Sequence, residues 1–437
     1  MTTAAENELL TRIGHGTPMG ALMRQYWLPA CLSSELTADG DPLRLMLLGE
    51  KLIAFRDSAG RIGVLDHRCP HRCASLFFGR NEEGGLRCAY HGWKFDAAGN
   101  CLEMPNLPAD QEFRHKVKAK AYRAAERGGL VYLYMGEREA APPLPTIEAT
   151  LCPSEEMNVS CCMRECNWLQ ALEGDIDTSH FSFLHTGKVE LDDIDPDHLE
   201  RFQLIDRAPR YHVKATDWGT MYAAYRPAQP GHLYYRFAHF VFPFWTLFPN
   251  GPLTDNILAQ AWVPMDDTHV MSYQFNWKYK TPVLSLTRTG EPLPLLARTT
   301  ATLPNTPDWF GRWRPVANQG NDYLIDREAQ RTISYTGIAG VFPQDSAMTE
   351  SMGDITDRTI EHLAPSDRMI VITRRRLADA ARSLRDDGAL PPLVDDPGIG
   401  MSIRSGDLIA PEEQPWLEAY ERTLQQALHP DVLLAAE

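Results

Sequence analysis

The sequence lacks the features of a membrane-spanning or secreted protein. No apolar run approaches the ~20 residues that a membrane-spanning helix needs. The longest apolar stretch, residues 237–248, is interrupted by His239 and Pro243. The N-terminus carries Glu6 and Glu8 and no basic, hydrophobic signal region. Positive charge is also in short supply: the formal net charge is −15, which argues against nucleic acid or an anionic membrane as a partner.

Cysteine is scarce, and its pattern does not favour disulfide bonds. The 437 residues include 9 cysteines, an odd number that contains the adjacent pair Cys161 and Cys162. In a chain without a signal sequence, we interpret them as reduced thiols and metal ligands of a soluble, cytoplasmic protein. There are no repeats and no long low-complexity tract. The length predicts two or three domains' worth of core.

Two short segments each pair a cysteine with a histidine. Cys69-Pro70-His71 is followed, after 16 intervening residues, by Cys88-Ala89-Tyr90-His91. Two thiolates and two imidazoles form the ligand set of a Rieske 2Fe–2S cluster, whose potential lies at roughly −150 to +300 mV because two neutral ligands replace thiolates. A structural zinc site is the alternative. Zinc motifs usually pair like ligands, whereas each segment here is mixed.

The second segment continues as Gly92-Trp93-Lys94-Phe95, and the whole pattern resembles the Rieske motif of the Rieske non-haem iron oxygenases. The resemblance implies a 2Fe–2S cluster held by Cys69, His71, Cys88 and His91. It also implies a second cofactor, a mononuclear Fe(II), elsewhere in the chain.

A second motif places His180 and His185 after Asp177 in the spacing Asp-x-x-His-x-x-x-x-His. Residues five apart on a regular helix lie roughly 140° apart, so the two histidines can share a metal only if the helix ends or bulges between them. Gly174 and Thr178 are weak helix formers, consistent with such a break, and π-bulges are frequent at functional sites. Two unrelated histidines near a helix end are the alternative. Beside the Rieske motif, this spacing is similar to the mononuclear iron motif of the same family.

A facial triad of two histidines and one carboxylate needs an acid from elsewhere in the chain. The family supplies an Asp or Glu far downstream, and residues 340–351 resemble that region, so Asp345 is the predicted third ligand. An N-cap role is the structural alternative for Asp345. Glu350, Asp354 and Asp357 are the other candidate ligands.

Asp177 resembles the family's bridging aspartate, which links an iron site to the Rieske histidine of a neighbouring subunit. By this resemblance, His91 donates to Asp177 of an adjacent chain, and the protein is a homo-oligomer, either a trimer or stacked trimers. A metal-bound histidine usually gives its other N–H to a carboxylate, which agrees with a contact between Asp177 and His180. Glu173, one turn earlier, either joins the bridge or is a solvated helix acid.

The pattern along the chain predicts an α+β fold, with a small all-β Rieske domain followed by a catalytic domain whose antiparallel sheet is flanked by helices. The predicted parts are an N-terminal helical segment that packs on the catalytic domain (1–42), the Rieske domain (43–140), a proline-containing linker (141–150) and the catalytic domain (151–437). Helices are expected near 5–26, 165–178, 365–387 and 412–428, and strands between 200 and 280.

Further segments, such as residues 355–363, look like the phthalate dioxygenase branch. The resemblance implies O2-dependent cis-dihydroxylation of a small aromatic carboxylate, such as a phthalate isomer or a phenoxybenzoate. It also implies a partner reductase with flavin and a 2Fe–2S cluster that uses NAD(P)H. Two alternatives stay open: a monooxygenase or O-demethylase of a methoxybenzoate-type aromatic, and a Rieske electron carrier without oxygenase activity. A carboxylate substrate needs an arginine, because guanidinium binds carboxylate bidentately. Arg207 is the first choice, ahead of Arg226 and Arg236.

Overall fold

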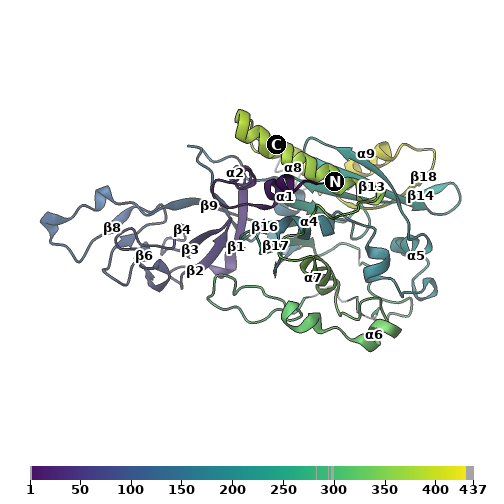
Figure 1. The fold of residues 1–437 in the computed structure, drawn as a ribbon, viewed down its shortest axis with the longest axis horizontal. Helices are drawn as coiled ribbons and strands as arrows, with labels where there is room; N and C mark the ends of the chain where they lie inside the picture. The colour runs from purple at the N-terminus through teal and green to yellow at the C-terminus, as the bar shows by residue number, and fades with distance from the viewer. Residues whose placement is uncertain (1, 282, 294, 297–299, 430–437) are drawn as a thin grey trace.

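The computed structural model describes residues 2–281, 283–293, 295–296 and 300–429. A six-stranded antiparallel sheet forms the centre of its N-terminal part. Its strand order is β1-β10-β9-β4-β3-β2, and a four-stranded sheet, β5-β6-β7-β8, lies at one end of the long axis of the molecule (Figure 1). The strands are β1 (Trp27–Leu32), β2 (Leu43–Leu47), β3 (Glu50–Arg56), β4 (Ile62–Asp66), β5 (Arg80–Glu82), β6 (Gly85–Arg87), β7 (Lys94–Phe95), β8 (Cys101–Glu103), β9 (Ala121–Arg127) and β10 (Leu130–Tyr134).

The predicted N-terminal helical segment, residues 1–42, is helical only in its first part. Helices α1 (Ala4–Thr11) and α2 (Pro18–Met23) begin after the capping residues Thr3 and Thr17. The next segment is not helical but forms β1, which pairs with β10. Its short apolar run cannot be distinguished from a buried helix by periodicity alone, and pairing with a distant strand decides the outcome.

A larger antiparallel sheet of eight strands forms the second half of the molecule. Its order is β11-β17-β16-β15-β14-β13-β12, and β18 pairs with β14. The strands are β11 (Met157–Arg164), β12 (Arg210–Ala215), β13 (Gly219–Pro227), β14 (His232–Val241), β15 (Trp245–Leu247), β16 (Leu258–Pro264), β17 (Val270–Trp277) and β18 (Gly406–Pro411). Strands expected between residues 200 and 280 are therefore confirmed.

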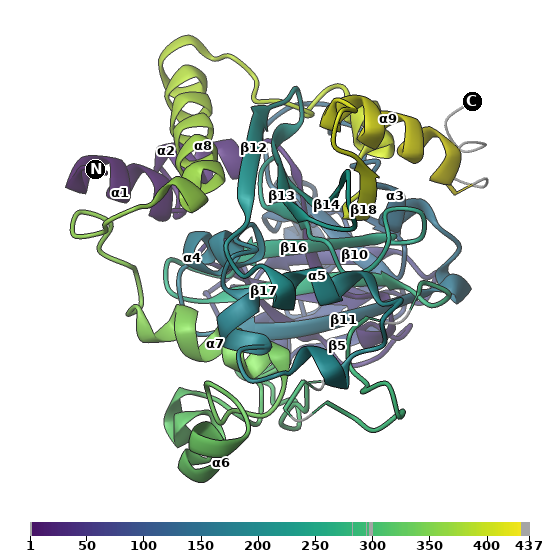
Figure 2. The same cartoon turned by 90° about the vertical axis from the view of Figure 1, so that its right-hand side faces the viewer.

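Helices cover both faces of this sheet, as Figure 2 shows. Side chains alternate between the two faces of a strand. On β13, Tyr222 joins the core that contains Trp168 of α4, whereas Met221 packs on the opposite face with Tyr420 of α9. The helices are α3 (Glu148–Leu151), α4 (Trp168–Asp175), α5 (Phe202–Ile205), α6 (Arg327–Thr332), α7 (Val341–Ser351), α8 (Arg368–Asp387) and α9 (Trp416–Ala427). This arrangement confirms the predicted α+β architecture.

The N-terminal helices α1 and α2 pack against α8 of the second half, as both views show (Figures 1 and 2). Within the described part of the chain, none of the helices has both the length and the apolar character required to cross a lipid bilayer.

Candidate metal centres

The four predicted cluster ligands lie on two loops of similar shape. Cys69 and His71 follow β4, and Cys88 and His91 lie between β6 and β7. In the first loop the N–H of Cys73 donates to the carbonyl of Cys69, and in the second the N–H of Gly92 donates to the carbonyl of Cys88, both at 2.9 Å. The two loops meet at their histidines, since the rings of His71 and His91 have centroids 4.4 Å apart.

The surroundings of these side chains fit an iron–sulfur cluster. Cys69 and Cys88 are both buried, and burial, reinforced by the neighbouring Cys88 thiol, raises the pKa of the Cys69 thiol to about 12. The ring of His71 stacks on Trp93 at 4.3 Å, and its Nδ1 is buried without a hydrogen-bond partner among the described residues. Two adjacent thiols and an imidazole nitrogen without a protein partner are the donors that a Rieske cluster uses.

The second motif lies where α4 ends. After Asp175 the chain leaves the α-helix, and residues 181–185 form a wider π-helical turn in which the N–H of Thr186 donates to the carbonyl of Phe181 at 3.1 Å. The rings of His180 and His185 consequently lie side by side, with centroids 5.1 Å apart. The predicted break between the two histidines is confirmed.

Asp345 joins the two histidines from α7, which is far away in the sequence. Its Oδ1 lies 3.1 Å from Nε2 of His185 and 3.6 Å from Nε2 of His180. The donor atoms of these three residues all lie within 4.8 Å of one another. Asp345 lies inside α7, so the alternative of an N-cap is wrong.

The other candidate acids make different contacts. Glu350 accepts hydrogen bonds from the backbone N–H of Glu165 and from the hydroxyl of Tyr323. The side chain of Asp357 accepts from Thr359, and Asp354 accepts at its backbone carbonyl from Asn167.

Negative charge surrounds the two imidazoles. Asp177 Oδ2 lies 3.4 Å from Nδ1 of His180, and this carboxylate, against the opposing effect of burial, raises the pKa of His180 to about 9. Burial disfavours the charged form of Asp345, but His185, His180 and Arg164 outweigh it and lower the pKa of Asp345 to about 2. A site that stabilises positive charge between nitrogen and carboxylate donors fits a divalent iron.

Comparison with known proteins agrees with both centres. The Rieske [2Fe-2S] domain family matches residues 26–121, and the family described as LigXa C-terminal domain like matches residues 133–432. The 3-chlorobenzoate-3,4-dioxygenase oxygenase subunit of Comamonas testosteroni is 49% identical over 433 residues, which cover 97% of this chain and 99% of that protein. The chain belongs to the Rieske non-haem iron oxygenases.

Two further matches place this oxygenase within the family. The phthalate 4,5-dioxygenase oxygenase subunit of Pseudomonas putida is 40% identical, with 87% of this chain and 86% of that protein covered. The solved structure of Pseudomonas putida CBB5 NdmA (QL mutant with caffeine) shares the fold, with a TM-score of 0.58 at 16% identity, over 91% of this chain and 99% of that one. The protein is therefore the terminal oxygenase component of an aromatic ring-hydroxylating or demethylating system. It carries a Rieske 2Fe–2S cluster and a mononuclear iron, and it uses O2 and electrons from a reductase or ferredoxin.

One contact of the oxygenase's iron site was missed in the sequence. Gln344, the residue before Asp345, lies with its Oε1 2.7 Å from Nδ1 of His185. Its amide nitrogen donates to the carbonyls of Leu295 at 3.1 Å and Ile338 at 2.8 Å. Because the NH2 group faces two acceptors, Oε1 must face His185, which therefore carries its proton on Nδ1 and leaves Nε2 free to bind a metal. In the sequence, the only sign of a role for Gln344 is its position next to Asp345.

Glu173 is not a solvated helix acid, so that alternative is wrong, and a part in the bridge between subunits stays a prediction. Its carboxylate is buried and accepts from Arg358 at 3.1 Å and from Arg374 at 2.5 and 2.9 Å. These arginines come from distant segments, which the helix periodicity around Glu173 could not reveal. The ion pairs connect α4 with α8.

The remaining predicted residues are placed as follows. Asp177 accepts from the N–H and the hydroxyl of Ser179 at 2.8 and 2.6 Å, beside His180. Arg207 donates to the carbonyl of Gly187 at 2.9 Å, and its guanidinium lies 5.8 Å from the centre of the Phe183 ring. The bridging role of Asp177 and the substrate role of Arg207 stay predictions.

Proposed function

We propose that this oxygenase adds both atoms of O2 to the ring of an aromatic carboxylate, forming a cis-dihydrodiol. The observation that carries the proposal is the convergence of His180, His185 and Asp345, because a triad of this composition leaves positions open on iron for the reaction. The substrates in the names of two relatives, 3-chlorobenzoate and phthalate, are aromatic carboxylates and support this substrate class. Phthalate isomers and phenoxybenzoates belong to the same class.

In this proposal Cys69, His71, Cys88 and His91 hold the Rieske cluster, and the triad holds Fe(II). The two iron centres supply one-electron chemistry with O2, which amino-acid side chains cannot perform. The residues around the triad keep its donors in place. Asp177 faces Nδ1 of His180, so that Nε2 of this ring points to Asp345. An NAD(P)H-dependent reductase with flavin and a 2Fe–2S cluster would supply the electrons.

The proposal also includes contact between subunits, in which His91 of one subunit donates to Asp177 of the next. The cluster loops and the end of α4 lie in different halves of the elongated chain (Figure 1), which favours transfer between subunits over transfer within one. Large apolar side chains are exposed within both motifs: Tyr90 in the second cluster loop, and Phe183 between the two histidines of the triad. Exposed apolar residues that gather on a surface mark interaction sites. A closed ring such as a trimer would cover both surfaces, and sedimentation equilibrium of the holoenzyme tests this.

An oxygen-uptake screen tests the proposed reaction. The holoenzyme and a compatible reductase are given benzoates, phthalate isomers, phenoxybenzoates and methoxybenzoates under ¹⁸O2, and mass spectrometry counts the labelled atoms in each product. Two labelled atoms in a diol support dihydroxylation. One labelled atom, or loss of a methyl group, identifies a monooxygenase or O-demethylase instead. Reoxidation of the cluster without any oxygenated product would contradict the proposal and favour an electron carrier.

A further inference from the structure

Four side chains on one face of the catalytic sheet form a polar cluster, buried except for the half-buried Tyr211, that the proposed chemistry does not use. They are Tyr211 on β12, Tyr222 and Arg226 on β13, and Tyr234 on β14. Arg226 lies opposite Tyr234 in the strand register, and Tyr211 lies opposite Ala224. Because alternate residues share a face, all four side chains point to the side of the sheet on which α4 packs.

This polar cluster lies next to the iron site. Burial and then the carboxylate of Asp177 raise the pKa of Tyr211, which places its hydroxyl within electrostatic reach of that carboxylate. A second chain of contacts runs through Phe181, whose ring centroid is 5.4 Å from that of His185. The guanidinium of Arg236, on the same face of β14, lies 5.1 Å from the Phe181 ring. The polar cluster and the triad therefore border the same region of the interior.

Arg226 is fully buried but only partly hydrogen-bonded to the described residues. Its side chain is 0% exposed, and its Nε donates to the carbonyl of Asp206 at 2.6 Å. Nη1 and Nη2 are buried, and neither has a hydrogen-bond partner among the described residues. Buried charges are normally paired, because an uncompensated charge in the interior is costly. The hydroxyls of Tyr211, Tyr222 and Tyr234 are also buried and form no hydrogen bond with the part of the chain that the structure describes.

The other two candidate arginines have different surroundings. Arg236 pairs with Glu200 at 3.5 Å, lies 3.9 Å from Asp407 and donates to the carbonyl of Pro249 at 2.7 Å. Arg207 is only partly buried, and it contacts Gly187 and Phe183 near the surface. Among these three arginines, Arg226 is the one whose Nη1 and Nη2 are both buried without a hydrogen-bond partner among the described residues.

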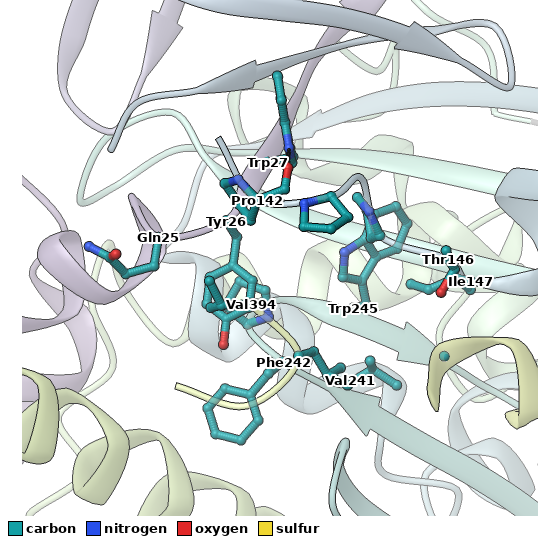
Figure 3. A pocket seen from close by; sticks show the side chains of 15 residues that line it. Gln25, Tyr26, Trp27, Pro142, Thr146, Ile147, Val241, Phe242, Trp245 and Val394 are labelled. Carbon is teal, nitrogen blue, oxygen red and sulfur yellow. Dashed lines mark hydrogen bonds between the residues drawn. The ribbon is translucent and has the colours of Figure 1, made fainter. Parts of the chain in front are cut away.

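A separate pocket does not offer such a site. Figure 3 shows its lining, which joins the N-terminal part, the segment before α3 and the start of β15, with Trp27, Pro142, Phe242 and Trp245 among the residues drawn. It contains no charged side chain and none of the residues proposed to hold iron. An aromatic acid has no counter-ion there.

We infer that Arg226 binds the carboxylate of the aromatic substrate, while the ring of the substrate lies between the polar cluster and the triad. The inference rests on the proposed function, namely that the substrate is an aromatic acid. The guanidinium fork presents two parallel N–H donors that match the two oxygens of a carboxylate. One unpaired arginine matches one carboxylate, so benzoates are expected to bind more tightly than phthalates.

The test compares a charged and a neutral ligand of the same shape. Binding of 3-chlorobenzoate and 3-chlorobenzamide to the holoenzyme is measured without O2, and KM and kcat for 3-chlorobenzoate are measured with the reductase. Arg226→Met is expected to weaken 3-chlorobenzoate binding by about 10- to 100-fold, the size expected for lost charge-assisted hydrogen bonds, with little effect on the amide. Arg226→Lys keeps the charge without the fork and should lie in between. Arg210→Gln, at an exposed position of β12, is the matched control.

Three results separate the inference from the proposed function. If Arg226→Met distinguishes the acid from the amide as the wild type does, the inference is wrong although the substrate class stands. If Arg207→Gln loses this discrimination instead, the carboxylate belongs to Arg207 and the inference is again overturned. If the wild type neither binds nor oxidises any aromatic acid, the proposed function itself fails. If Arg226→Met does not fold, Arg226→Lys provides the test. An unchanged affinity of Arg226→Lys for 3-chlorobenzoate would contradict bidentate binding by Arg226.

Discussion

Replacing Gln344 by methionine should loosen the mononuclear iron without touching any proposed ligand. Methionine has nearly the same volume and length, so the change removes hydrogen bonds with little effect on packing. The variant loses the acceptor 2.7 Å from Nδ1 of His185 and the two donors to the carbonyls of Leu295 and Ile338. His185 is then free to rotate or to move its proton to Nε2, the nitrogen that faces Asp345.

The size of the effect follows from the lost acceptor. His185 is 4% exposed, so water cannot replace Gln344 as the partner of its Nδ1–H. A buried donor left without a partner costs about 1–3 kcal/mol. Since 1.4 kcal/mol corresponds to a factor of ten, iron affinity should fall by roughly 5- to 150-fold. This range agrees with the 10- to 100-fold typical of residues that orient a metal-bound histidine.

Iron retention provides the assay. Holoenzyme is dialysed against a ferrous chelator of graded concentration, and mononuclear iron per chain is determined at each step. The Rieske cluster of the same molecule is an internal standard, because its absorbance and its EPR signal in the reduced state should not change. Gln425→Met, at an exposed position on α9, is the control substitution. Iron retention within twofold of the wild type would refute the proposed role of Gln344.

Two further variants test Asp177, the proposed bridge between subunits, and Glu173, the buried partner of Arg358 and Arg374. Asp177→Asn keeps the shape of the side chain but removes its charge beside His180. Turnover should therefore fall by about 100-fold. Both metal centres should stay filled, and metal analysis and EPR of the cluster measure this. Glu173→Gln should lower the free energy of unfolding in urea by about 3–5 kcal/mol, because Arg358 and Arg374 lose their buried partner. The control Glu421→Gln, at an exposed position on α9, should leave the free energy of unfolding unchanged. Despite burial, Arg358 and Arg374 lower the pKa of Glu173, so the unfolded state takes up the proton first as pH falls. The stability from this carboxylate is therefore present above its ordinary pKa of 4.5 and lost below it, and urea midpoints at pH 7 and pH 4 should differ more in the wild type than in Glu173→Gln.

Regular elements with a strong local pattern were predictable. Strands were expected between residues 200 and 280, and segment 270–277, in which apolar and polar residues alternate, forms β17. Helix α8 occupies most of the predicted segment 365–387. The first sheet shows the opposite case, because the apolar run of β1 is compatible with either structure and only its pairing with β10 makes it a strand.

Residues close together in the sequence revealed the chemistry of both metal sites. The two cysteine–histidine loops and the pair of histidines at the end of α4 each contain their donors within a few residues. The spacing of these donors, together with the resemblance to the family's motifs, was therefore enough to predict both sites. Asp345 could be chosen through family resemblance, but its place inside α7 rather than at a helix start could not.

Other features depend on segments that meet only after the chain has folded. Gln344 contacts His185 across 159 residues, and Glu173 contacts Arg358 and Arg374 across 185 and 201. The same is true of Arg226. Only the assembled strands β12, β13 and β14 show that its Nη1 and Nη2 have no partner among the described residues. Whether a buried polar atom has a partner depends on which side chains surround it in space, and local periodicity contains no information about neighbours so distant along the chain.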